Sequence, residues 1–170
     1  VGSNLSRMDF SMARYFDYLD TGEVLAFESA GMATGRRGRI LTGAYRKSLG
    51  NPFRLTNRVA SLGINTLTIR IDGSRAGFFL HERDPSRVAV DSSLIGVAPA
   101  GEFTPSDRTL ESIDSDFSLW RNIMREYAEE YLGEEEAKGQ GGRWIDYGSS
   151  SPYVELQRGL DEGTVRCWLL

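Results

Sequence analysis

The residues best suited to chemistry are three glutamates that fall close together, Glu126, Glu129 and Glu130. They stand at positions i, i+3 and i+4, so on a helix their carboxylates crowd one patch and repel each other unless a cation neutralises them. Hard divalent cations such as Mg²⁺ take oxygen ligands and often share them with substrate phosphates. The spacing is compatible with a Mg²⁺ site, while the simpler alternative is that the glutamates solvate an ordinary helix.

The helix that must position these glutamates is predicted over residues 115–132. Apolar residues fall on one arc of a helical projection, and the three glutamates fall on the adjoining flank. Ser115 or Asp116 is the expected N-cap, and Gly133 is expected to end the helix. Arg125 and Glu129 stand at i, i+4, which predicts an ordinary surface ion pair. The apolar arc comprises Phe117, Trp120, Ile123, Met124, Tyr127, Ala128 and Tyr131.

The rest of the chain mixes helical and strand patterns. An amphipathic helix is expected over 10–23, ended by Gly22, and a short helix near 153–160. Asp72-Gly73 predicts a hairpin turn. Leu67, Ile69 and Ile71 alternate with polar residues, which predicts a strand with one buried face. The fold class is therefore α/β or α+β. The expected strand segments are 39–49, 59–72, 77–83, 87–101 and 164–170.

Length and composition indicate one domain spanning 1–170, with the helical stretch 6–22 as a connecting element. No apolar run approaches the roughly 20 residues that cross a bilayer, and no signal peptide begins the chain. The single cysteine, Cys167, is expected to be a small core residue, and a cytoplasmic location is expected. Because Val1 is not methionine and the chain stops in an apparent strand, we expect a piece of a longer protein.

Charge is unevenly distributed along the chain. Eight basic and no acidic residues lie between Ser29 and Ile71, whereas the segment 101–140 is acidic. The sequence pI of about 5.1 argues against nucleic acid as a partner of the whole chain. The basic segment could still meet a phosphate-bearing ligand, with Arg46 and Arg54 as candidate contacts; the alternative is a solvated basic surface.

Several catalytic arrangements find little support. His81 is the only histidine, so a histidine metal cluster cannot form, and no G-x-S-x-G elbow occurs. The glycine-rich stretch "GMATGRRGR" matches no nucleotide-binding fingerprint and is interpreted as a loop.

The stretch "REYAEEYLG" resembles the core of the Nudix box, Arg-Glu-U-x-Glu-Glu-x-Gly-U, and "VAPAGEF" resembles the strand and glycine turn that open it. This resemblance implies an α/β/α sandwich around a mixed β-sheet. It implies that Glu126, Glu129 and Glu130 would be Mg²⁺ ligands or the base, that Arg125 would orient them, and that Gly101 would be the opening glycine. In active members, water attacks a phosphorus of a diphosphate.

The chain departs from that box where the box is strictest. Asp107 stands where glutamate is expected, and seventeen residues rather than seven separate it from Arg125. Gly133 arrives one position late, and an insertion over 108–117 would have to loop out. A Nudix-like fold is therefore favoured over a working hydrolase.

Residues from about 40 to about 133 also resemble the C-terminal region of bacterial helix-turn-helix transcriptional regulators; the resemblance includes "GAYRKSLGNPFRLTNRVASLGINTLTIRIDG" and "LWRNIMREYAEEYLG". It implies a ligand-sensing or interaction domain, non-catalytic or weakly active, that reaches DNA only through a missing N-terminal domain. We expect a nucleotide-like or phosphorylated small molecule as ligand, no membrane partner, and compatibility with a homodimer. A Mg²⁺-dependent pyrophosphohydrolase acting on nucleoside diphosphate derivatives and a structural or dimerisation module are the alternatives.

Overall fold

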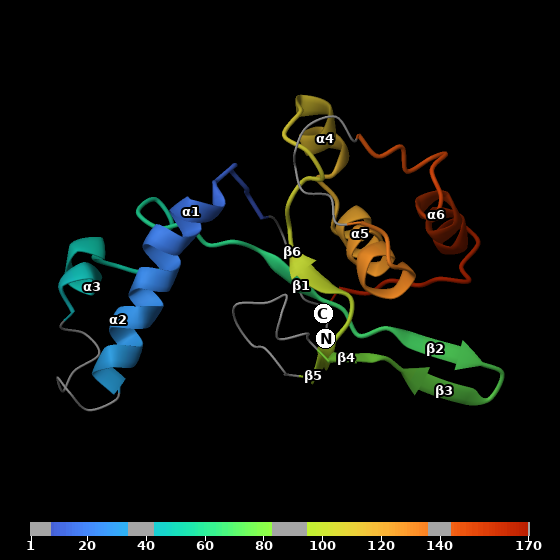
Figure 1. Ribbon diagram of the computed structural model, residues 1–170, viewed down its shortest axis with the longest axis horizontal. Helices are drawn as coiled ribbons and strands as arrows, with labels where there is room; N and C mark the ends of the chain where they lie inside the picture. Colours follow the sequence, from blue (N-terminus) through green and yellow to red (C-terminus); the bar gives the residue numbers. More distant parts are fainter. Residues whose placement is uncertain (1–7, 34–42, 83–94, 136–143, 170) are drawn as a thin grey trace. The chain divides into compact units, whose positions relative to one another are not determined.

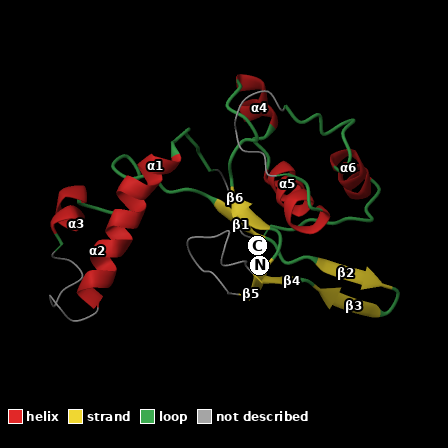
Figure 2. Cartoon of the chain, in the orientation of Figure 1, coloured by secondary structure: helices red, strands yellow, loops and turns green. Residues whose placement is uncertain are grey.

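The computed structural model describes residues 8–33, 43–82, 95–135 and 144–169. They belong to two compact units, Val1–Ser61 and Leu62–Leu170, and each unit is described on its own. Helices and short strands both occur (Figures 1 and 2). Among the described residues, no helix has the length and apolar character that crossing a membrane requires.

The first unit contains one helical stretch that runs further than predicted. It consists of α1 (Tyr15–Tyr18), a π-helical turn η1 (Leu19–Glu23) and α2 (Val24–Ala33). Gly22 does not end the helix, so that prediction was wrong. Gly22 lies inside the π turn, where an added methyl group would stand 3.0 Å from the ring of Tyr18. The absence of a side chain at Gly22 therefore leaves room for the ring of Tyr18.

A second helix of this unit, α3 (Ala44–Leu49), replaces part of a predicted strand. The carboxylate of Glu28 on α2 accepts hydrogen bonds from the backbone N–H groups of Tyr45 (3.1 Å) and Arg46 (2.8 Å). A carboxylate at a helix N-terminus satisfies amides that have no partner within the helix. The strand prediction was wrong because this cap comes from a distant part of the chain; residues 39–42 lie outside the described residues.

The strands of the second unit pair in three antiparallel ladders. β1 (Gly63–Asn65) pairs with β6 (Ala100–Glu102), β2 (Ile69–Asp72) with β3 (Arg75–Phe78), and β4 (Leu80–Glu82) with β5 (Ile95–Val97). The turn between β2 and β3 contains Gly73 with φ +58°, a conformation that glycine adopts without strain. The predicted hairpin at Asp72-Gly73 is confirmed.

The predicted buried face of this hairpin is not buried. Leu67, Ile69 and Ile71 are 52%, 56% and 74% exposed. The alternation correctly located the strand but says nothing about whether another layer covers its apolar side. The β2–β3 ribbon extends beyond the shorter strands β4 and β6 (Figure 1).

Three helices complete this unit: α4 (Leu110–Ser115), α5 (Leu119–Leu132) and α6 (Tyr153–Asp161). The predicted helix 115–132 therefore starts later, and its N-cap is Ser118, whose side chain accepts from the N–H of Arg121 at 3.4 Å. Its end at Gly133, with φ +74°, is confirmed. The segment expected to loop out instead forms α4, capped by Thr109. The short helix near 153–160 is confirmed.

The C-terminal prediction fails in the described part of the chain. Residues 166–169 form no strand, and Cys167 is exposed rather than a core residue. A mixture of helices and strands is thus confirmed, while the strands seen are all antiparallel. The α/β/α sandwich stays a prediction.

Candidate functional site

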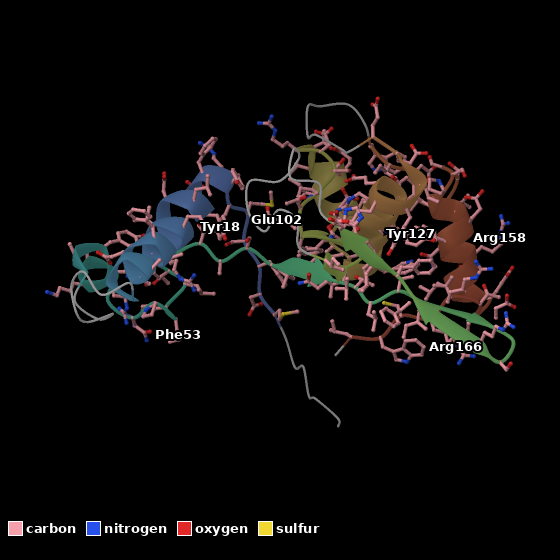
Figure 3. All side chains as sticks on the ribbon, turned by 60° about the horizontal axis from the view of Figure 1, so that its bottom comes forward. Tyr18, Phe53, Glu102, Tyr127, Arg158 and Arg166 are labelled. Carbon is pink, nitrogen blue, oxygen red and sulfur yellow. The ribbon has the colours of Figure 1, made fainter. Side chains whose placement is uncertain are left out.

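Helix α5 carries four of the predicted site residues, Arg125, Glu126, Glu129 and Glu130. The side of α5 that is most buried differs from the predicted one. Met124 and Ala128 are fully buried, as expected, but Asn122 and Arg125 are buried beside them, with exposed fractions of 0% and 4%. Tyr127, placed at the centre of the predicted arc, is only half-buried. The stick view labels Tyr127 among the side chains that surround α5 (Figure 3). The helix therefore buries a polar stripe that its hydrophobic pattern did not indicate.

Arg125 is the centre of that polar stripe. Its Nη1 donates to the hydroxyl of Tyr147 at 2.7 Å and lies 3.3 Å from Oδ1 of Asp116. Its Nη2 donates to Oδ1 of Asn122 at 2.9 Å and to the carbonyl oxygen of Thr104. The guanidinium turns to the interior, so the predicted surface position of Arg125 was wrong.

The carboxylate of Asp116 completes this arrangement. Its Oδ2 accepts from both the N–H and the hydroxyl of Ser106 at 2.6 Å, and its Oδ1 accepts from the hydroxyl of Tyr147 at 2.6 Å. Burial raises the pKa of Tyr147 above its usual value; the nearby charge of Arg125 lowers it, and the hydrogen bond to Asp116 raises it again. We call Ser106, Asp116, Asn122, Arg125 and Tyr147 the Arg125 cluster.

The charged groups of the Arg125 cluster pair with each other, while Nδ2 of Asn122 is buried without a hydrogen-bond partner in the part of the chain that the structure describes. The charge of Arg125 meets a carboxylate, and both groups are hydrogen-bonded on several sides. Such pairing removes most of the cost of burying two charges. A group that must bind a ligand or transfer a proton needs access that these buried atoms lack. The cluster therefore holds α5 against the loops that carry Thr104, Asp116 and Tyr147, and its role is structural.

The glutamates lie on a different flank of α5, next to β6. A methyl group added at Gly101 would overlap the carboxylate of Glu126, so that carboxylate rests against the Gly101 backbone. Oε1 of Glu130 accepts from the N–H of Ala100 at 3.4 Å, and its Oε2 is buried. All three glutamates are half-buried. They do not form the fully solvated outer face that was the simpler alternative.

As arranged, the three carboxylates do not form a three-ligand metal site. Within the described ranges, no three side chains of aspartate, glutamate, histidine or cysteine gather closely enough to hold a metal ion. Two of the carboxylates are directed to β6, at Gly101 and Ala100, rather than to a common point. The predicted Mg²⁺ site stays a prediction, and no reaction step is derived through it.

The two predicted phosphate contacts lie in the first unit. Arg46 is on α3, where its Nη1 donates to the carbonyl oxygen of Gly50 and so binds the end of its own helix. The backbone N–H of Arg54 donates to the carbonyl oxygen of Asn51 at 3.0 Å within a turn, and Arg54 is exposed. Gly101 and the glutamates belong to the second unit.

A hollow of about 450 Å³ lies beside α4, lined among the described residues by Asp107, Thr109, Glu111 and Trp144. Its volume is within the usual range for small-molecule sites. Of its two acidic residues, Asp107 is buried and Glu111 is exposed. The carboxylate of Glu111 would repel a bare phosphate, so a phosphorylated ligand would be expected there only together with a cation.

Sequence reasoning missed Asp116 and Tyr147, the two partners of Arg125. Asp116 was considered only as a helix cap, and Tyr147 was not singled out. They lie nine and 22 positions from Arg125 in the chain, so no helical spacing joins them. The one available signal was Asn122, which stands three residues before Arg125 and so shares its helix face.

Comparison with known proteins found no match to this chain among family models, curated proteins or solved structures.

Proposed function

We propose that this chain is a ligand-sensing or interaction domain of a transcriptional regulator, non-catalytic or at most weakly active, with a Nudix-like α/β/α sandwich around a mixed sheet. The observation that carries the proposal is the position of Arg125. In the Nudix resemblance this arginine orients the glutamates. Here its guanidinium is bound in the interior by Asp116, Tyr147, Asn122 and the carbonyl oxygen of Thr104.

The glutamate flank supports the same proposal. Glu126 and Glu130 contact the backbone of β6, so they fasten the helix to a strand. A helix fixed on one flank by the Arg125 cluster and on another by these contacts is a rigid scaffold. A rigid scaffold of this kind suits a site that recognises a ligand. The hollow beside α4 is where we propose that the ligand binds.

In a sensing role, the ligand can shift DNA binding only if its affinity differs between two conformations of the protein. We propose a nucleotide-like or phosphorylated small molecule, accompanied by a cation where it meets the exposed carboxylate of Glu111. DNA itself would be contacted by a separate N-terminal domain.

A Mg²⁺-dependent pyrophosphohydrolase is the second candidate, and one contact favours it. The carboxylate of Glu126 rests on Gly101, the glycine that the Nudix resemblance places beside the glutamate helix. In that case the glutamates would hold Mg²⁺ after rearrangement, and the metal would polarise the diphosphate.

The test is a thermal-shift titration with a panel of nucleoside diphosphate derivatives, with and without Mg²⁺ and Mn²⁺. We expect a ligand to raise the melting temperature, because binding at 100 times its Kd adds about 2.7 kcal/mol of stability. Glu111→Gln should change that shift and Glu129→Gln should not. Stabilisation by metal alone that Glu129→Gln removes would contradict the proposal and favour the hydrolase.

A further inference from the structure

The two compact units carry opposite formal charge. Val1–Ser61 contains nine basic and five acidic residues, a formal charge of +4, whereas Leu62–Leu170 contains 11 basic and 19 acidic residues, a formal charge of −8. The acidic pI of the whole chain therefore conceals a cationic first unit. Attraction to phosphates depends on the local excess of positive charge, so the first unit has to be considered on its own.

The described part of the first unit concentrates its positive charge on α3 and the turn after it. The segment 43–61 contains four basic residues and no acidic one. The carboxylate of Glu28, which contacts α3, accepts hydrogen bonds from backbone N–H groups at the start of that helix. Among the described residues, no carboxylate forms an ion pair with any of the four basic side chains. The four are Arg46, Lys47, Arg54 and Arg58.

Two of the guanidinium groups are fixed to the turn itself. Nη1 of Arg46 donates to the carbonyl oxygen of Gly50, and Nε of Arg58 donates to the carbonyl oxygen of Pro52 at 2.9 Å. These carbonyls are two residues apart, so at most about 7 Å of backbone separates them. Each bond uses one of the five N–H groups of a guanidinium, and the others can donate to phosphate oxygens. A guanidinium that is already positioned loses less freedom when it does so.

An exposed aromatic ring lies on the same turn. Phe53 is 86% exposed at the surface of the first unit (Figure 3). Its N–H donates to Oδ1 of Asn51 at 3.0 Å, and the N–H of Arg54 donates to the carbonyl oxygen of Asn51 at 3.0 Å. The ring therefore belongs to a hydrogen-bonded turn that also carries basic side chains. We call Arg46, Lys47, Phe53, Arg54 and Arg58 the Phe53 patch.

We propose that the Phe53 patch binds single-stranded nucleic acid, with phosphates at the four basic side chains and a base stacked on the ring of Phe53. The positive charge selects a polyanion, and the exposed ring selects one that carries flat aromatic groups. A single strand supplies both, and every base can stack on such a ring whatever the sequence. In a duplex the bases already stack on each other. The inference does not rest on the proposed function.

An anionic membrane is the other surface that attracts basic and apolar side chains together. Besides Phe53, the turn 50–58 exposes one large apolar side chain, Leu55, which is little to insert into a bilayer. The whole chain has a formal charge of −4, so an extended anionic plane would repel it. A single strand is narrow enough to meet the patch alone, because charges beyond about 10 Å are screened. Charge and exposure therefore favour the strand.

The experiment is fluorescence anisotropy of a labelled 15-nucleotide oligothymidine titrated with the 170-residue chain, from about 50 to about 300 mM KCl. We expect a Kd of about 1–100 µM at 150 mM KCl, and a slope of about −2.8 when log K is plotted against log[salt], about 0.7 for each of four phosphate contacts. Lys47→Gln and Arg54→Gln should each change the slope to about −2.1. Arg158→Gln is the control, because it removes the same charge from an exposed residue of α6, and it should leave the slope unchanged.

The stacking contact has a separate readout. Phe53→Ala should weaken binding by about 5- to 150-fold at every salt concentration without changing the slope, because it removes a stacking surface but no charge. It should leave binding to a 15-base-pair duplex unchanged. Phe27→Ala is the matched control, because Phe27 is 83% exposed on α2, a helix without basic residues, and should change the affinity by less than about twofold. Far-UV circular dichroism should show the same helix content in every variant.

Four results would overturn the proposal. One is no binding of the oligonucleotide by about 100 µM chain in 50 mM KCl, the condition that favours it most. Another is equal weakening by Phe53→Ala and Phe27→Ala, and a third is a slope that neither Lys47→Gln nor Arg54→Gln changes. The fourth is binding to vesicles of phosphatidylcholine and phosphatidylglycerol without binding to the oligonucleotide, which would assign the Phe53 patch to a membrane surface.

Discussion

The two polar flanks of α5 bury charge in different ways. Arg125 is 4% exposed and meets the opposite charge of Asp116 within the Arg125 cluster. The glutamates on the other flank are half-buried, and two of them lie against the backbone of β6. Full burial requires complete pairing, whereas partial exposure lets water carry part of the charge. The difference indicates that the Arg125 flank fixes the helix more firmly than the glutamate flank.

The largest expected effect is the loss of the buried charge pair. Arg125→Met leaves the carboxylate of Asp116 in the interior without its cation, and we expect the free energy of unfolding to fall by about 3–5 kcal/mol. Urea denaturation measures this change. The double variant Arg125→Met with Asp116→Asn should recover part of the loss. A loss below about 1 kcal/mol, as at a surface pair, would contradict the structural role of the Arg125 cluster.

A smaller loss is expected from the hydroxyl that joins the two charges. Tyr147→Phe removes one donor to Asp116 and one acceptor from Arg125, which should cost about 1–3 kcal/mol. Tyr127→Phe is a matched control, because Tyr127 is a half-buried ring on α5 itself and lies outside the Arg125 cluster. Equal losses in the two variants would show that the hydroxyl of Tyr147 contributes no more than a hydroxyl outside the Arg125 cluster.

The same hydroxyl gives the protein a stability that depends on pH. The pKa of Tyr147 is raised in the folded protein by burial and by its bond to Asp116, so the unfolded chain releases the phenolic proton first. This contribution is complete below about pH 10, the usual tyrosine pKa, and is lost above it by up to about 1.4 kcal/mol per pH unit. Wild type should therefore lose more stability than Tyr147→Phe between about pH 9.5 and 11.5. Identical pH profiles would contradict the raised pKa.

The smallest effect concerns the contact between Gly101 and Glu126. Gly101→Ala places a methyl group where the carboxylate lies, but that carboxylate ends a flexible side chain and can move. We expect a loss of about 1 kcal/mol. Combining it with Glu126→Ala should remove the clash, so a double-mutant cycle should give a coupling of about 0.5 kcal/mol or more. Simple additivity would show that the two residues do not touch.

Local signals in the sequence were sufficient to predict several elements of the structure. Gly133 ended α5 where a left-handed cap was expected, and Asp72-Gly73 made the turn of the hairpin. The end of α5 and the hairpin turn both require a positive φ, which glycine adopts at little cost. The local sequence is therefore enough to predict them. The helix α6 followed from its apolar spacing in the same way.

Elements decided by distant contacts could not be predicted. The aromatic and β-branched pattern before Leu49 indicated a strand, yet Glu28 from another helix caps α3. The helical projection treated Arg125 as a surface residue, because it cannot show that Asp116 and Tyr147 fold back against it. Alternation likewise located β2 without showing that its apolar side is open. In each case the missing information was what packs against the element.

The most direct test of the proposed function is a turnover assay in Mg²⁺ and Mn²⁺ with the nucleoside diphosphate panel, comparing wild type and Glu130→Gln. The amide oxygen of glutamine can still accept the hydrogen bond from Ala100, so the variant should remain folded. Because the guanidinium of Arg125 is held in the interior by Asp116, Tyr147 and Asn122, we predict that the two proteins release product at the same background rate. Metal-dependent release by wild type that Glu130→Gln abolishes would contradict the account and identify the chain as a hydrolase.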